Sequence, residues 1–473
     1  MINLIFKDSV VYGLGAILPR VITFMTIPIL VRYLSPEQYG TLELLATFSS
    51  LMVIILSLGL DSSLSYYFFK YKRQRANLLK TILIIRLIGS VLFFLFIYFL
   101  IGLFGDQLFG LTNDKQIILL ILINSVFFQL FSLFIEIYRL EFKPKQFIFL
   151  SNLHSISSTI LSVLFCVKFG LELTGYFIGL LVPTLLSFFI LAILRNDIFT
   201  KGRYDHRLMV RNMKFGIPML PAALSMYVIT SLDKWMINYQ LGPSELAVYA
   251  LGVKLALIFK LAIDVFRKAW WPHAAKAMSN SYGINLFRLV SLLYAIVVSV
   301  GVIVYSILIP VLLSWIGGDY YKESQWIAML LILESAFYGY FMIGCLGMWK
   351  MEKTYINTVL MVFAALLNIL LNITFIPMYG IFGAAFATII SSFIWLVISI
   401  FVSNKLWNVG LNNKITISLI LSSFLFPCLF YFFHVKDFVF FLPFVILYFS
   451  LLYISFRLVL DLNKKLPYEK IKT

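Results

Sequence analysis

Residues 286–309 read LFRLVSLLYAIVVSVGVIVYSILI, and from Leu289 to Ile309 this stretch contains no charged residue. A run of about 20 apolar residues is long enough for an α-helix to cross the hydrocarbon core of a bilayer. Similar runs recur along the 473-residue chain, which is 62% hydrophobic and 12% charged. A soluble protein of this size needs roughly 25% charged residues to cover its surface. The sequence therefore excludes a soluble globular fold and predicts an all-α polytopic membrane protein.

Charged residues and Pro or Gly breaks divide the chain into about fourteen predicted transmembrane helices. They lie at approximately 8–34, 41–68, 81–103, 116–139, 148–168, 175–194, 215–239, 246–267, 286–309, 325–348, 355–376, 381–403, 415–434 and 438–459. The loops between them are short, so we expect no soluble domain on either face. Because a membrane glycosyltransferase generally carries its chemistry on a long external or acidic loop, the chain is not predicted to be an enzyme.

The distribution of Lys and Arg predicts how the helices are oriented. With the N-terminus in the cytoplasm, 28 cations fall on the cytoplasmic side, 5 on the opposite side and 5 within the spans. Cytoplasmic loops of membrane proteins carry an excess of Lys and Arg. We therefore expect both termini to be cytoplasmic. The same rule accounts for the net charge of +17 without a nucleic-acid partner.

Two similar loops indicate that a unit of six spans is repeated. SPEQYG at 35–40 follows the first span and GPSELA at 242–247 follows the seventh, with Pro36 and Pro243 207 residues apart. Because six is even, both halves have the same orientation, as in the parallel repeats of transporters. The alternative is that such turns recur by chance. We predict two pseudo-symmetric six-helix lobes around a central cavity at 1–200 and 201–408, helices 13 and 14 at 409–460, and a basic cytoplasmic tail at 461–473.

The run NILLNITFIPMYGIFGAAFAT at 368–388 resembles a pattern of the Wzx-type polysaccharide-export flippases, which belong to the multidrug/oligosaccharidyl-lipid/polysaccharide transporter superfamily. The resemblance extends over approximately residues 5–405, including LSPEQYG at 34–40, LGLDSS at 58–63, YALGVKL at 249–255 and AWWP at 269–272. From the residues alone, Asn368 and Asn372 share one helix face and are expected to hydrogen-bond to a neighbouring helix. The small residues that follow favour close helix packing.

The resemblance implies a flippase that moves undecaprenyl-pyrophosphate-linked oligosaccharide repeat units across the bacterial cytoplasmic membrane by alternating access. It implies a role in the biosynthesis of O-antigen, capsule or exopolysaccharide, alongside a polysaccharide polymerase and glycosyltransferases. No cofactor is expected, although Na⁺ or H⁺ is a candidate coupling ion. The alternatives are a cation-coupled drug antiporter of the same superfamily, a flippase for lipid II or a teichoic-type precursor, and a non-transporting membrane scaffold.

Charges deep in the spans are the candidate binding residues, since each costs about 2.5–3.5 kcal/mol near the bilayer centre. Arg20 lies near the middle of the first span, and PRVITF at 19–24 is similar to a segment of the lipid II flippases. A guanidinium stays charged and matches phosphate oxygens with two parallel hydrogen bonds. We therefore predict that Arg20 contacts substrate in the cavity, with a structural ion pair to Asp61 or Glu334 as the alternative.

Three further deep charges are predicted to line the same cavity, and they are Lys254, Asp61 and Glu334. The two carboxylates are interpreted as counter-ions to the cations or as sites that exchange Na⁺ or H⁺. The secondary candidates are Lys260, Lys234, Asp233, Arg86 and His154. The charged ones lie nearer to span ends, where snorkelling or local pairing can satisfy them, for example between Lys260 and Asp264. His154 is interpreted as a hydrogen-bonded structural residue in preference to a proton relay. The three cysteines share no metal spacing, and no metal site or catalytic residue is predicted.

Overall fold

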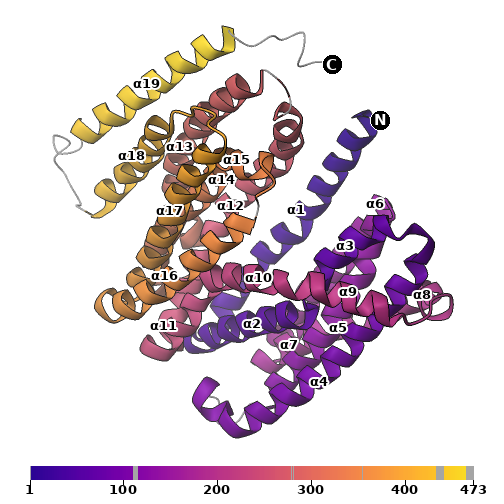
Figure 1. The fold of residues 1–473 in the computed structure, drawn as a ribbon. Coiled ribbons are helices and arrows are strands. Elements are labelled where there is room, and N and C mark those ends of the chain that lie inside the picture. The colour runs from indigo at the N-terminus through magenta and orange to yellow at the C-terminus, as the bar shows by residue number, and fades with distance from the viewer. Residues whose placement is uncertain are drawn as a thin grey trace. The chain divides into compact units, whose positions relative to one another are not determined.

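The computed structural model describes the backbone of residues 2–109, 115–278, 280, 282–353, 355–432 and 442–464. Side chains are described for residues 18–100, 115–278, 280, 282–353, 355–424 and 443–464. The described chain is built of helices, as Figure 1 shows, which confirms the predicted all-α class. The predicted basic tail beyond Lys464 lies outside the described residues.

Twelve helical segments of the described chain are long and apolar enough to cross a membrane. They are Pro36–Lys70, Lys72–Leu100, Lys115–Leu140, Pro144–Lys168, Glu172–Leu194, His206–Leu241, Pro243–Ala277, Gly283–Ile316, Asp319–Gly344, Tyr355–Tyr379, Ile381–Leu406 and Pro443–Lys464. The other two predicted spans fall on α1 (Ile2–Tyr33) and α18 (Asn413–Phe432), whose side chains are described only in part. The multi-span membrane protein predicted from hydropathy is therefore confirmed.

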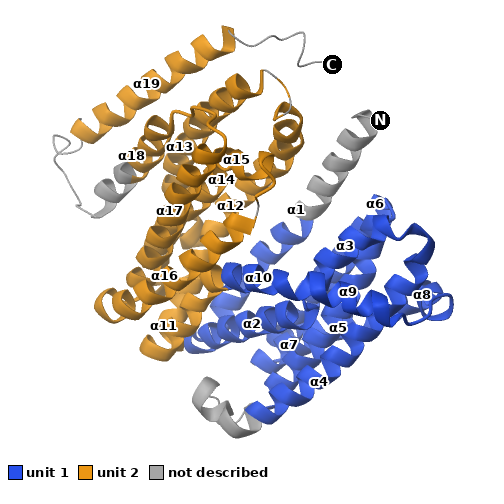
Figure 2. Ribbon diagram, viewed as in Figure 1, with its two compact units in different colours: residues 1–227 blue, residues 228–473 orange. Residues whose placement is uncertain are grey.

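The chain forms two compact units, residues 1–227 and 228–473, which Figure 2 colours separately. The helices of unit 1 are α1, α2 (Pro36–Ser57), α3 (Leu60–Lys70), α4 (Arg75–Phe109), α5 (Lys115–Leu140), α6 (Pro144–Val163), α7 (Glu172–Leu194), α8 (Asn196–Thr200), α9 (His206–Gly216) and α10 (Leu220–Tyr227). Those of unit 2 are α11 (Asp233–Leu241), α12 (Pro243–Ala277), α13 (Gly283–Ile316), α14 (Ser324–Gly344), α15 (Leu346–Lys350), α16 (Tyr355–Tyr379), α17 (Ile381–Leu406), α18 and α19 (Leu442–Lys464).

The two similar loops found in the sequence both start a helix with proline. Ser35 caps α2, because its hydroxyl accepts the backbone N–H of Gln38 while the Gln38 side chain accepts the N–H of Ser35. Proline suits the first helical position, where no N–H is needed inside the helix. Pro36 and Pro243 both occupy it, at the starts of α2 and α12. The shared turn is thus a helix start in both units.

The seventh predicted span is irregular and crosses the boundary between the units. Its N-terminal part, α9, is followed by a 3₁₀ turn at Ile217–Met219 and by α10, which ends at Tyr227. A π-helical turn at Val228–Leu232 and α11 complete it in unit 2. Pro218 lies within the 3₁₀ turn and removes one backbone donor there. The unit boundary therefore lies inside a helical segment, 27 residues beyond the predicted lobe boundary at residue 200.

A second break, between α2 and α3, touches this irregular segment within unit 1. Leu58 and Gly59 are both left-handed, with φ of 51° and 65°. A Cβ built on Gly59 would lie 2.2 Å from the carbonyl oxygen of Gly216, so the two backbones are in direct contact. Glycine is required at residue 59 both for its conformation and for this close approach.

Gly59→Ala is expected to lower the free energy of unfolding by about 2 kcal/mol or more. The left-handed conformation costs alanine about 1–2 kcal/mol, and the contact with Gly216 must also open. Gly170→Ala is a matched control, because Gly170 has φ of 66° but nothing within 4 Å of a built Cβ. Thermal unfolding in detergent measures both variants. Equal losses in the two would contradict the proposed backbone contact.

In unit 2, the motif at 368–388 packs as its residues predict. Asn368 on α16 donates to Ser391 of α17 over 3.2 Å, and Asn372 donates to the Asn368 side chain over 3.0 Å. A Cβ built on Gly383 would lie 2.1 Å from the Phe375 carbonyl oxygen, so only glycine fits between these helices. The expected hydrogen bond to a neighbouring helix is confirmed for Asn368, whereas Asn372 bonds to Asn368 on its own helix.

Candidate functional site

In unit 1, the deep acid Asp61 is bound by a buried arginine. Arg86 Nη2 of α4 lies 2.5 Å from Asp61 Oδ1, at the start of α3. Arg86 Nη1 also donates to the Gln129 carbonyl oxygen of α5 over 3.0 Å, and Gln129 donates to Ser90 over 2.8 Å. The Arg86 side chain is 1% exposed, whereas that of Asp61 is 49% exposed. Of the two outcomes expected for Arg86, snorkelling or pairing, the structure shows pairing, and one edge of the Asp61 carboxylate remains accessible.

Arg20 is an exposed residue of α1. One turn further on, Thr23 lies 3.3 Å from Thr159 of α6, hydroxyl to hydroxyl. The polar side of α1 thus continues from Arg20 toward α6, the helix that packs along it. This places a guanidinium on an exposed part of a helix that the sequence predicts to span the membrane.

His154 of α6 is buried and packed. Its Nε2 lies 3.1 Å from the Thr184 hydroxyl of α7, and its ring stacks on Phe131 with 4.3 Å between centroids. Its fractional exposure is 7%. One hydrogen bond and one stacked ring are the contacts expected of a structural histidine.

In unit 2, Lys260 pairs with a carboxylate on another helix. Its Nζ lies 3.3 Å from both carboxylate oxygens of Glu334 on α14, while Asp264 pairs with Arg267 over 3.4 Å. The Lys260 and Glu334 side chains are 19% and 13% exposed. Both ion pairs therefore remain partly exposed. The partner of Lys260 is on α14 and not on its own helix.

Tyr338 connects these two ion pairs and was not singled out in the sequence. Its hydroxyl accepts from Arg267 Nη1 over 3.1 Å, and Lys260 Nζ lies 5.7 Å from its ring centroid. Glu334 and Tyr338 are four residues apart on α14, and Lys260 and Arg267 are seven apart on α12. This helical spacing was the available signal, since such residues share one face. Together they form a polar strip between α12 and α14.

Exchanging the charges of Lys260 and Glu334 tests whether the polar strip is stabilised by the ion pair itself, in either direction. Lys260→Glu is expected to place two carboxylates together and to lower the free energy of unfolding, since like charges repel in a medium of low dielectric. Adding Glu334→Lys should restore stability, measured by thermal unfolding. If Lys260→Glu left the stability unchanged, the observed pairing would be contradicted.

Asp233, Lys234 and Lys254 also belong to unit 2. Asp233 is 3% exposed, and its carboxylate accepts from the Tyr249 hydroxyl and from the backbone N–H of Lys234 over 2.8 Å. The local pairing expected for Asp233 is thus made mainly to a tyrosine. Lys234 is 9% exposed, and Lys254 is half-buried on α12. Asp233 is a buried packing group, whereas Lys254 keeps an accessible edge.

Outside the spans, Arg195 joins the ends of two helices of unit 1. Its guanidinium donates to both Glu141 carboxylate oxygens, over 2.8 and 3.2 Å, and to Asp197 over 3.1 Å. Burial lowers the pKa of Arg195, but the hydrogen bonds that its guanidinium donates to Asp197 and Glu141 outweigh this effect and raise the pKa above its usual value. The group is a permanently charged clamp.

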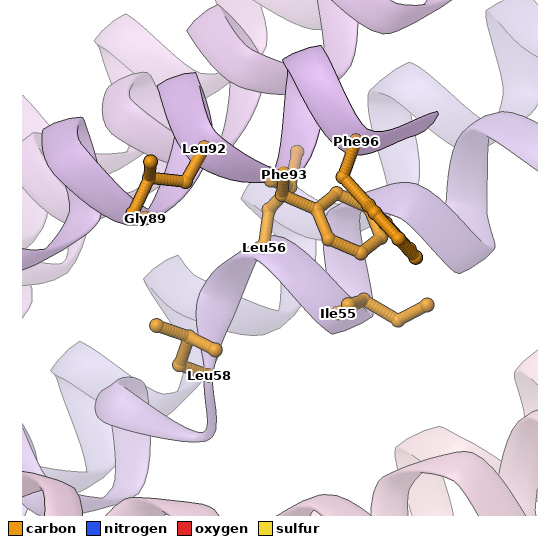
Figure 3. Close-up of a pocket in the computed structure, with 7 residues that line it drawn as sticks. All are labelled: Ile55, Leu56, Leu58, Gly89, Leu92, Phe93 and Phe96. Atoms are coloured by element: carbon orange, nitrogen blue, oxygen red, sulfur yellow. The ribbon is translucent and has the colours of Figure 1, made fainter. Parts of the chain in front are cut away.

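An apolar pocket of about 290 Å³ lies in unit 1 between the end of α2 and α4. Figure 3 shows its lining residues, which are Ile55, Leu56, Leu58, Gly89, Leu92, Phe93 and Phe96. No polar side chain lines it. Its surface suits hydrocarbon and offers nothing to a sugar or a phosphate, so the candidate headgroup site rests on the charged residues above.

Comparisons with known proteins identify a family for this chain. A family described as "Polysaccharide biosynthesis protein" matches residues 5–278. A Lsg locus protein of Haemophilus influenzae is 22% identical over 339 residues, covering 70% of this chain and 81% of the relative.

Two solved structures show the same fold. The lipid II flippase MurJ in an inward closed conformation superposes with a TM-score of 0.63 at 15% identity, covering 94% of this chain and 98% of that one. An inward-facing multidrug resistance MATE family transporter of the MOP superfamily gives 0.64 at 14% identity, covering 82% and 94%. The expected superfamily fold is confirmed.

Proposed function

The chain belongs to the polysaccharide biosynthesis protein family, and from this membership we propose that it is a flippase for lipid-linked oligosaccharides. The proposed substrate is an undecaprenyl-pyrophosphate-linked repeat unit for O-antigen, capsule or exopolysaccharide. It moves from the cytoplasmic to the outer leaflet of the bacterial cytoplasmic membrane by alternating access, and a polymerase and glycosyltransferases act on either side of this step. Such a headgroup is bulky, polar and anionic, and must cross about 30 Å of hydrocarbon.

The structural observation that carries this proposal is Arg20, an exposed residue of α1. Arg20 lies 13 residues before Tyr33, the last residue of α1. At a rise of about 1.5 Å per residue this is roughly 20 Å into a 30 Å core. An exposed charge at this depth requires a polar cavity or an anionic partner. A diphosphate supplies the paired oxygens that a guanidinium binds best.

Charged residues of unit 2 support the same proposed substrate. Lys254 and Lys260 are the proposed second set of contacts with the diphosphate, and Tyr338 offers an aromatic ring and a hydroxyl to the sugars. Glu334 pairs with Lys260 across α12 and α14. Glu334 and Asp61 are also the proposed carboxylates for a coupling Na⁺ or H⁺.

The test is depletion of the protein in its host, followed by mass spectrometry of the extracted polyprenyl lipids. Accumulation of a polyprenyl-diphosphate oligosaccharide is expected, and its mass gives the sugar composition. Re-expression of the wild-type chain should clear the accumulated lipid, which controls for indirect effects on synthesis. An unchanged lipid pool would overturn the proposal.

A cation-coupled drug antiporter is the second candidate, favoured by the fold shared with the MATE family transporter. Its specific support is Asp61, because a half-exposed carboxylate in a span attracts cationic ligands. Depletion would then raise sensitivity to cationic drugs and leave the polyprenyl lipids unchanged. Accumulation of the oligosaccharide lipid would exclude this candidate.

Cysteine labelling tests the proposed orientation, in which both termini are cytoplasmic. In a cysteine-free background, Lys405→Cys at the end of α17 should react with a membrane-impermeant maleimide only after the cells are opened. Lys322→Cys, in the loop before α14, should react in intact cells. Both side chains lie outside the apolar parts of the helices. External labelling of residue 405 would contradict the orientation.

A further inference from the structure

We propose that a basic surface of unit 1 binds the headgroups of anionic phospholipids, independently of the proposed transport substrate. The surface consists of eight exposed cations from two segments of the chain, Lys70, Lys72, Arg73, Lys201, Arg203, Arg207, Arg211 and Lys214. We call this set the basic surface.

The two segments are about 130 residues apart in the sequence and are held together by hydrogen bonds. The backbone N–H of Arg203 donates to Asn77 Oδ1 over 2.9 Å. Arg211 Nη1 donates to the Tyr71 hydroxyl over 2.8 Å. Figure 1 shows α9 beside α3, and these helices pack directly on each other. The cations are therefore gathered on one ordered surface.

Among the described side chains, none of the eight cations forms an ion pair with a carboxylate. Three other basic residues at helix ends of unit 1 do have carboxylate partners, since Arg139 pairs with Glu136, and Lys143 and Arg195 pair with Glu141. The nearby Asp205 carboxylate is used to cap α9. The basic surface thus keeps its full positive charge for an external anion.

The position of α9 places these cations at headgroup level. The segment His206–Leu241 has 36 residues, which is about 54 Å of helix against a hydrocarbon core of about 30 Å. The apolar part from Leu220 onward suffices to span the core, so α9 lies in the interface. Leu208 is buried on one side of α9, whereas Arg207 and Lys214 are exposed on the other. Because Leu208 packs into the core of unit 1, α9 turns its charged side away from the protein.

Exposed aromatic rings beside the basic surface favour a membrane over an acidic protein as the partner. Phe69 directly precedes Lys70 and is 42% exposed, and Phe142 is 77% exposed with its centroid 5.9 Å away. A protein surface in water would hide such a pair, whereas aromatic rings are enriched at the membrane interface. Anionic lipids attract adjacent Lys and Arg residues there.

The test measures binding of fluorescent phosphatidylglycerol to the full-length protein in neutral micelles, by fluorescence anisotropy. The wild type should bind it more tightly than phosphatidylcholine and lose the difference at high salt. Lys72→Gln/Arg73→Gln/Arg207→Gln/Lys214→Gln is expected to weaken binding of phosphatidylglycerol about tenfold or more. The matched control Lys268→Gln/Lys276→Gln/Lys353→Gln/Lys405→Gln removes the same charge from exposed residues of unit 2 and should change it less than about twofold.

Thermal unfolding in neutral micelles checks that both variants fold. The proposal is overturned if the basic-surface variant binds phosphatidylglycerol as the wild type does. It is also overturned if the control loses as much affinity, because net charge alone would then explain the binding. Should the variant fail to fold, equal wild-type binding of phosphatidylcholine and phosphatidylglycerol decides against the proposal by itself.

Discussion

Replacement of Arg20 by alanine is expected to abolish export of the polysaccharide while the amount of protein in the membrane stays unchanged. Two charge-assisted hydrogen bonds to the diphosphate would be lost, at about 1.5–3 kcal/mol each, which predicts a drop of at least about 100-fold. The guanidinium is exposed, so its removal leaves no cavity. Complementation of a deletion strain, with immunoblotting of membranes, measures both quantities.

Arg20→Lys separates charge from geometry at this position. An ammonium keeps the charge but cannot make the paired contact, so partial export is expected. Lys145→Ala is the control, since Lys145 is an exposed cation at the start of α6. Normal export by the Arg20→Ala variant would remove Arg20 from the transport site.

Asp61→Asn is expected to destabilise the protein by about 3 kcal/mol. The substitution leaves the Arg86 guanidinium, 1% exposed, without a negative charge. Removing one partner of a buried pair costs about 3–5 kcal/mol, and the half-exposed Asp61 puts this pair at the lower end. Arg86→Met should cost less, because the Asp61 carboxylate that remains is half-exposed. Thermal and denaturant-induced unfolding in detergent shows whether Asp61→Asn destabilises the protein more than Arg86→Met does.

The double variant Asp61→Asn/Arg86→Met distinguishes a structural pair from a transport residue. Since both charges are removed, most of the lost stability should return. If Asp61 takes part in transport as proposed, export stays low in this stable variant, whereas restored export assigns the pair a structural role. A double variant no more stable than Asp61→Asn would contradict the buried-pair account.

The helices could be predicted from sequence because hydropathy is a local property of each segment. The run at 286–309 lies within α13, and the motif at 368–388 packs α16 on α17 through Asn368 as its spacing indicates. The breaks at Gly59 and Gly216 could not be placed in the same way. Their contact joins segments 157 residues apart, and no local pattern reports such a distant contact.

The ion-pair partners of the charged residues within the spans could not be predicted from the sequence. Lys260 and Asp264 are four residues apart, and local spacing favoured a pair between them. The structure gives Lys260 a partner on α14 instead, and it gives Asp61 the buried Arg86 of α4. Such choices depend on how helices distant in sequence pack together. The chemical types of the candidate residues were predictable, but their pairing was not.

The unit boundary inside the seventh span has a consequence for the exchange of halves between related proteins. A chimera joined at residue 200 would take α9 and α10 from one parent and the helices that they pack on, α2, α3 and α4, from the other. The close backbone contact between Gly59 and Gly216 would then have to form between sequences that did not evolve together. A junction within Val228–Leu232 keeps both partners in one parent. A chimera should therefore exchange the compact units, with a boundary at residue 227, and not the six-span repeats predicted from the sequence.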